Sequence, residues 1–161
     1  SQRIQEAYFM EAKSYFMLSP RYTLDQDDTY TGIDKLQVFI NRFPNSEYVS
    51  EALELMDELQ NKLEKKDFEI SKQYYTIRDY ASAIKSLDNF IADNPGTIFR
   101  EEALYYKWLS QYEIAINSIE SRIVERVTEL ERSLDNFLRY YPDTIFIEDL
   151  SEKINIAKQL L

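Results

Sequence analysis

Carboxylates are the main chemistry-bearing side chains of this sequence. Its 161 residues include 29 Asp and Glu against 19 Lys and Arg, with no Cys and no His. Thiol nucleophiles, imidazole bases, disulfides, Cys/His zinc sites and the Ser-His-Asp triad are therefore excluded together. The chemistry left open is a metal site built from carboxylates, or a catalytic pair of carboxylic acids.

Three aspartates stand close together, at Asp25, Asp27 and Asp28. An EF-hand calcium loop that begins at Asp25 needs glycine at its sixth position and glutamate at its twelfth. Those positions hold Tyr30 and Leu36, so the motif fails. We predict a solvated loop in which Asp28 or Thr29 caps the following helix, and no metal site.

A pair of carboxylates could also hydrolyse a glycosidic bond. No pair stands out, because acids such as Glu51, Glu54 and Glu58 fall on polar helix faces. There is no nucleophile and base from which to build a site. We predict that the protein is not an enzyme and uses no cofactor; a carboxylate-dependent hydrolase is kept as the alternative outside the binding class.

The charge balance points to protein partners. A net charge of −10 repels phosphate backbones and anionic lipid, which argues against nucleic acid as a partner. On this acidic background Arg122, Arg126 and Arg139 are predicted to form a basic docking patch; the alternative is a solvated helix face whose charges pair four residues apart. Tyr140 and Tyr106 belong to consecutive tyrosine pairs, in which one ring can face the core while the other anchors a partner; plain packing of both rings is the alternative.

The elements that position these residues come from a repeat. Three segments share the pattern L-x-x-F-[I/L]-x-x-x-P-x-[S/T] and begin at Leu36, Leu87 and Leu134. The Leu, Phe and Ile or Leu form one apolar helical stripe. Proline ends that helix, and the Ser or Thr two residues later is a good N-cap for the next one. Gly32 and Ala83, four residues before the first two leucines, leave room for a neighbouring helix.

The repeat predicts an all-α fold, a tetratricopeptide-like superhelix of stacked antiparallel helix pairs forming one domain over residues 1–161. No apolar stretch is long enough to span a membrane. The longest irregular stretch is the loop 19–28. Helices are predicted over residues 2–18, 29–43, 46–77, 80–94, 97–119, 121–141 and 145–161.

Ser1 fits the cap position of the same pattern, which suggests that an earlier repeat precedes this segment in a longer protein. The first helix would then lack a neighbour, because repeats are stabilised mainly by the repeats next to them. We therefore expect part of its apolar surface to be exposed, among Ile4, Tyr8, Phe9 and Met10.

Tyr74, Ala83, Leu87 and Pro95 fall at the spacing of the tetratricopeptide pattern. A resemblance that covers nearly the whole chain is to the BamD (YfiO) family of outer-membrane assembly lipoproteins. It rests on the loop Ser19-Pro-Arg-Tyr-Thr-Leu-Asp-Gln26, which no helix-packing rule demands, and on the segments 33–46 and 62–80. The chain resembles the C-terminal three of the family's roughly five repeats.

This resemblance implies a lipoprotein fixed to the outer membrane by a lipidated N-terminal Cys and facing the periplasm. It implies a part in the machine that folds and inserts β-barrel proteins. The C-terminal repeats would dock on a POTRA domain of the barrel subunit BamA, beside other subunits and unfolded outer-membrane proteins. Within the binding class, the alternative is another periplasmic adaptor or an oligosaccharide-binding lipoprotein; a sugar site would favour several tryptophans, and Trp108 is the only one.

Overall fold

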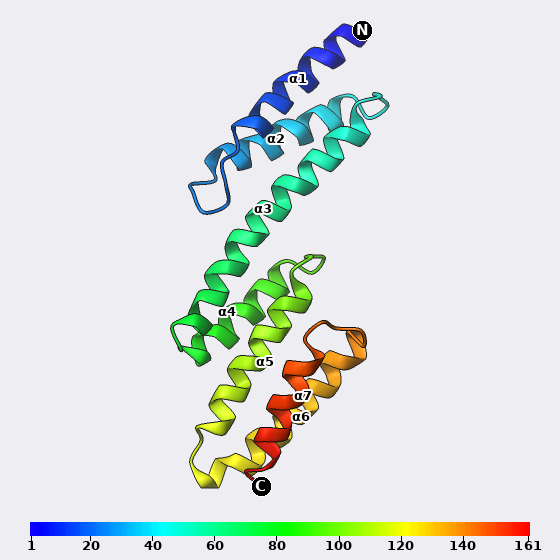
Figure 1. The fold of residues 1–161 in the computed structure, drawn as a ribbon. Coiled ribbons are helices and arrows are strands. Elements are labelled where there is room, and N and C mark those ends of the chain that lie inside the picture. The colour runs from blue at the N-terminus through cyan, green and yellow to red at the C-terminus, as the bar shows by residue number, and fades with distance from the viewer. The chain divides into compact units, whose positions relative to one another are not determined.

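Seven helices and no strands make up the computed structural model, which describes all residues from 1 to 161 (Figure 1). Each predicted helix is present, and neighbouring helices pack against one another. The all-α, tetratricopeptide-like prediction is therefore confirmed. The helices are α1 (Gln2–Leu18), α2 (Asp27–Arg42), α3 (Val49–Thr76), α4 (Tyr80–Asp93), α5 (Arg100–Ile116), α6 (Glu120–Tyr140) and α7 (Ile147–Lys158).

The chain divides into two compact units, Ser1–Asp67 and Phe68–Leu161. The division falls within α3, so that α1, α2 and the first part of α3 form the N-terminal unit. The remainder of α3 forms the C-terminal unit with α4, α5, α6 and α7. None of the helices has both the length and the apolar character needed to cross a bilayer.

The core of the N-terminal unit is built on the first repeat stripe. Leu36 and Phe39 of α2 are 0% and 1% exposed. They form one cluster with Phe9 of α1 and Leu59 of α3. The ring of Phe9 also stacks on that of Tyr48, with 4.9 Å between centroids. The apolar stripe read from the sequence therefore faces the two helices on either side of α2.

Part of the apolar surface of α1 is exposed, as predicted. Ile4 and Met10 are 49% and 55% exposed, whereas Phe9 is 2% exposed. Tyr8 is half-buried, because its ring packs edge-on against Phe43 at 5.5 Å. One side of α1 is thus covered by its own unit and the other is in contact with solvent.

The second repeat stripe is buried in the C-terminal unit. Leu87 and Phe90 of α4 cluster with Phe68 of α3 and Ala103 of α5. The rings of Phe68 and Phe90 lie 5.8 Å apart. Ala83, predicted to leave room for a neighbour, is completely buried. Both features confirm the alignment of this repeat.

The third stripe packs around the single tryptophan. Leu134 and Phe137 of α6 belong to the same cluster as Trp108 of α5 and Leu150 of α7. The indole N–H of Trp108 donates a hydrogen bond to the carbonyl oxygen of Leu130 at 3.1 Å. A buried tryptophan normally needs such an acceptor, so this contact fixes α5 against α6.

The turn after each repeat proline differs from the prediction. The helices α3, α5 and α7 begin three residues after Ser46, Thr97 and Thr144, so these residues are not N-caps. Each hydroxyl oxygen instead accepts a hydrogen bond from the backbone N–H two residues later, at 3.2–3.3 Å. Ser and Thr form such local turns readily. The turn precedes the helix, so the helix begins three residues after the Ser or Thr and not directly after it.

The loop between α1 and α2 is closed by a side chain. Gln26 is 5% exposed, and its amide nitrogen donates hydrogen bonds to the carbonyl oxygens of Arg21 and Leu24, both at 2.9 Å. Its amide oxygen accepts from the hydroxyl of Thr29 at 2.7 Å. These bonds satisfy backbone groups that no helix or strand satisfies, which gives a physical reason for a loop sequence that helix packing does not explain.

Lysines of α3 hold the same loop from the other side. The Lys62 ammonium donates to the hydroxyl of Ser19 at 2.7 Å, and that of Lys66 donates to the carbonyl of Leu24 at 2.8 Å. Between them Lys65 lies over the ring of Tyr22 at 4.6 Å. The loop is thus an ordered part of the N-terminal unit.

Gly32 marks a close approach of helices, as predicted. A Cβ placed there would lie 3.0 Å from Cδ1 of Leu59 and 3.5 Å from the backbone nitrogen of Phe16. We expect Gly32→Val to lower the free energy of unfolding by about 1–3 kcal/mol, the range for overpacked cores. Gly96→Val is the matched control, since nothing lies within 4 Å of that position. Urea denaturation that gives both variants the same stability would contradict the close packing.

Candidate functional site

The three clustered aspartates belong to the loop before α2 and to the first turn of that helix. The carboxylate of Asp25 accepts a hydrogen bond from the backbone N–H of Asp27 at 3.0 Å. Asp27 and Asp28 lie in the first turn of α2, where carboxylates interact favourably with the helix dipole. The prediction that Asp28 or Thr29 caps this helix is wrong, because α2 begins at Asp27 after Gln26. No group of three or more acidic side chains is placed to hold a metal ion.

The three arginines predicted to form a docking patch all lie on α6, but not together. Arg122 and Arg126 lie in its first two turns and Arg139 in its last. Arg139 follows Arg126 by thirteen positions, which is about 20 Å at 1.5 Å per residue. The prediction of one patch is therefore wrong, because residues distant along a helix are distant in space.

The arginines also differ in their partners. Arg122 pairs with Glu125 at 3.3 Å, and Arg126 donates to the hydroxyl of Ser118 at 2.6 Å. Arg139 is exposed and has no hydrogen bond or ion pair. It is the arginine of the three whose charge is free for a partner.

A small basic pocket lies between the start of α5 and the end of α6, and we call it the Arg100–Tyr140 pocket. The guanidinium of Arg100 donates to the hydroxyl of Tyr141 at 3.2 Å and lies 5.4 Å from the ring centre of Tyr140. Lys107, seven residues after Arg100 on α5, forms an ion pair with Asp88 at 2.6 Å. The pocket measures about 180 Å³ and is lined by Arg100, Leu104, Lys107, Trp108, Ser133, Asn136, Phe137 and Tyr140.

The sequence predicts Tyr140 as a partner-binding residue but gives no such prediction for Arg100 and Lys107. They lie more than thirty residues before Tyr140, and the packing of α5 on α6 brings them together. The available signal was their spacing of seven residues, which places both on one face of a helix. Carboxylates of a partner are the groups that this pocket suits, since Arg and Tyr side chains both donate hydrogen bonds.

The tyrosine pairs follow the predicted inside–outside arrangement in two cases. Tyr140 is 67% exposed while Tyr141 is half-buried, and Tyr74 is more exposed than Tyr75. Tyr106 departs from the pattern, because it and its neighbour in sequence are both half-buried. Its ring packs against that of Tyr75 at 5.3 Å, so the structure gives Tyr106 a packing role.

A hydrogen-bonded network links α5 to α7. The hydroxyl of Tyr105 donates to Oδ2 of Asp149 at 2.7 Å, and the ammonium of Lys153 donates to Oδ1 at 2.6 Å. Burial raises the pKa of Tyr105, and its bond to Asp149 raises it further. Burial also tends to raise the pKa of Asp149, but the bonds from Lys153 and Tyr105 outweigh it and hold that pKa below its ordinary value.

We expect Asp149→Asn to lower the free energy of unfolding at pH 7 by at most about 1 kcal/mol, because water screens a carboxylate that is 35% exposed. The folded pKa lies below the unfolded one. The stabilisation is therefore complete above the unfolded value of about 3.9 and is lost as the pH falls through the folded pKa. Urea denaturation should show a smaller difference between wild type and variant at pH 3 than at pH 7; an equal difference would contradict this role.

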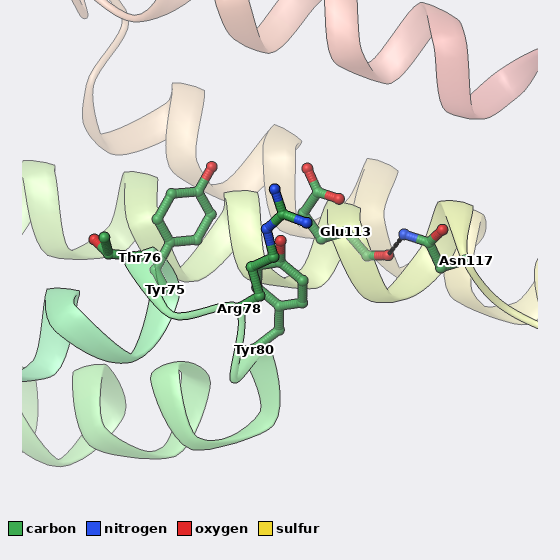
Figure 2. A pocket seen from close by; sticks show the side chains of 6 residues that line it. All are labelled: Tyr75, Thr76, Arg78, Tyr80, Glu113 and Asn117. Atoms are coloured by element: carbon green, nitrogen blue, oxygen red, sulfur yellow. Dashed lines mark hydrogen bonds between the residues drawn. The ribbon is translucent and has the colours of Figure 1, made fainter.

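A larger pocket of about 650 Å³ lies where α3 turns into α4, against the end of α5 (Figure 2). Tyr75, Thr76, Arg78, Tyr80, Glu113 and Asn117 line it. Burial raises the pKa of Tyr75, and the nearby carboxylate of Glu113 raises it further. No sequence pattern had marked these residues as a group.

Comparison with known proteins shows that this chain is similar to one protein family and to one assembly factor. The family model of the outer membrane lipoprotein YfiO matches residues 1–78 and 71–161. The outer membrane protein assembly factor BamD of Rickettsia prowazekii (strain Madrid E) is 29% identical over 102 residues. That alignment covers 63% of this chain and 41% of the relative, so the chain spans less than half of that protein's length.

Proposed function

Because this chain belongs to the YfiO family of outer membrane lipoproteins, we propose that it is a non-enzymatic adaptor in the machinery that folds and inserts β-barrel proteins. The match of the family model along the whole chain is the observation that carries this proposal. The name of the Rickettsia relative, an outer membrane protein assembly factor, supports the same process. The protein would act at the periplasmic face of the outer membrane, held there by a lipid anchor.

The partner in this proposal is a POTRA domain of the barrel subunit BamA, bound by the C-terminal unit. Other subunits of the machine and unfolded outer-membrane proteins are further partners. Two features of the unit support docking: Arg139 carries a free positive charge, and the Arg100–Tyr140 pocket places a second guanidinium beside an exposed ring. On a protein of net charge −10, such basic sites favour an acidic partner surface.

Binding of another kind finds less support. The only tryptophan, Trp108, is 1% exposed and hydrogen-bonded inside the core, so it is not available to stack on a sugar ring. The carboxylate of Asp149 is already bonded to Tyr105 and Lys153, and this network joins two helices. These contacts favour a protein-binding scaffold over an oligosaccharide-binding protein or a carboxylate-dependent hydrolase.

Affinity purification tests the proposal. The full-length lipoprotein, tagged at its C-terminus, is purified from detergent-solubilised outer membranes, with the untagged protein as control. We expect the barrel subunit to be recovered with the tagged protein alone. Recovery of the tagged protein without the barrel subunit, from membranes that contain both, would contradict the assignment.

A further inference from the structure

Arg78 has a backbone conformation that is unfavourable for an arginine. Its φ is 65°, the one positive value among non-glycine residues of the chain. It lies two residues after Thr76, the last residue of α3, and the next N–H, that of Asp79, donates to the carbonyl of Tyr74 at 2.9 Å. This is the Schellman helix end, in which glycine normally takes the left-handed position. An arginine in this position is therefore held in a conformation that costs free energy.

The side chain of Arg78 lines the 650 Å³ pocket, and the carboxylate of Glu113 lines it from α5 (Figure 2). Neither charged group forms an ion pair or a side-chain hydrogen bond. Strained residues of this kind gather at binding sites, where the surrounding fold holds them in place. Two opposite charges thus face one pocket, and each is free to meet a ligand.

Aromatic rings form the wall beside these charges. The rings of Tyr75 and Tyr80 lie 5.8 Å apart and are inclined at 55° to each other. Their hydroxyls add polar groups that can donate or accept hydrogen bonds. The side-chain nitrogen of Asn117 donates to the backbone carbonyl of Glu113 at 2.8 Å, so its amide oxygen remains open. The volume lies within the range of small-ligand sites.

The charges select the ligand class. An isolated anion is attracted by Arg78 and repelled by Glu113. An isolated cation is repelled by Arg78 and attracted by Glu113. A ligand that carries both charges satisfies both groups, and tyrosine rings also favour contact with peptide groups and cations. We propose that this pocket binds a peptide segment in which an acidic side chain lies close to a basic one, with Arg78 holding the acid and Glu113 the base.

Short peptides with blocked ends test this site directly in the whole 161-residue chain. One set carries an aspartate and a lysine separated by zero, one or two glycines; the matched set carries asparagine and glutamine instead. Binding is followed by NMR through the Arg78 side-chain Nε–H and the backbone amides of the pocket residues. We expect saturable shifts with at least one charged peptide and none with its neutral match. Shifts with neither set, or equal shifts with both, would overturn the proposal.

Charge variants separate this site from simple surface attraction. Arg78→Glu and Glu113→Arg should each weaken binding of the charged peptide about five- to tenfold. The double variant, R78E with E113R, restores one charge of each sign and should recover most of the affinity, since the peptide can bind in the reverse direction. Equal affinity of the single and double variants would contradict the paired roles.

Arg78→Gly separates binding from folding. Glycine suits the left-handed position, so this variant should melt at the same temperature as the wild type or above it. It should nevertheless weaken binding of the charged peptide nearly as much as Arg78→Glu does. If R78G binds like the wild type, the guanidinium has no part in the pocket; if it unfolds, Arg78 is needed for the turn itself, and both results overturn the proposal.

Discussion

Replacing Phe90 by alanine should lower the free energy of unfolding by about 3–5 kcal/mol, the usual cost of removing a large buried ring. The ring is 4% exposed and packs against Phe68 and Leu87 in the core of the C-terminal unit. The whole stability of a domain is commonly 5–15 kcal/mol. We therefore expect a large drop in the urea midpoint of this variant.

Tyr30→Ala is the control for this change. Its ring is of similar size but is 59% exposed, so its removal should cost well under 1 kcal/mol. Circular dichroism during urea denaturation measures both variants against the wild type. Equal midpoints for Phe90→Ala and the wild type would mean that the repeat stripe does not form the core, and the alignment of the three repeats would fail with it.

The helices and their buried faces could be predicted because both depend on local spacing. Leu36, Phe39, Leu87 and Phe90 recur at intervals that place them on one side of a helix, and all four are buried. The ends of the helices were less predictable. The sequence predicts Thr97 as an N-cap, but its hydroxyl oxygen accepts a hydrogen bond from the N–H of Phe99 and forms a turn. Such a residue offers the backbone two local arrangements, and the sequence does not distinguish them.

The candidate sites were harder to predict because they depend on contacts between helices. Arg126 and Arg139 belong to one helix, yet they lie thirteen positions apart along α6 and do not meet. Arg100 and Tyr140 are far apart in sequence, yet they line one pocket. The left-handed conformation of Arg78 gives no sequence signal at all, since the residue most often found there is glycine.

Reversing the charges of Arg100, which lines the Arg100–Tyr140 pocket, and of Arg139, which precedes Tyr140 in the sequence, should weaken partner binding about tenfold or more. In the R100E/R139E variant, two positive charges that would meet partner carboxylates become negative and repel them. R122E/R126E makes the same change of net charge at the other end of α6. There Arg122 is paired with Glu125 and Arg126 is bonded to Ser118, whereas Arg139 has no partner within the chain. We expect that matched variant to lose less than about threefold, through long-range repulsion alone.

Circular dichroism and thermal melting of both variants serve as the folding control. Arg100 also donates to Tyr141, so a small loss of stability is expected in R100E/R139E. If R122E/R126E proves the weaker binder of the two, the docking surface lies at the start of α6, where the first pair of predicted arginines lies, and not at the pocket.

Titration of the purified periplasmic POTRA domains of the barrel subunit against this chain tests the central claim most directly. The wild-type chain should bind one POTRA domain, and its affinity should fall as the salt concentration rises, because opposite charges attract across the interface. R100E/R139E should bind at least about tenfold more weakly at low salt, with a smaller difference at high salt. Absence of binding by the correctly folded wild-type chain to every POTRA domain at both salt concentrations would contradict the proposed docking.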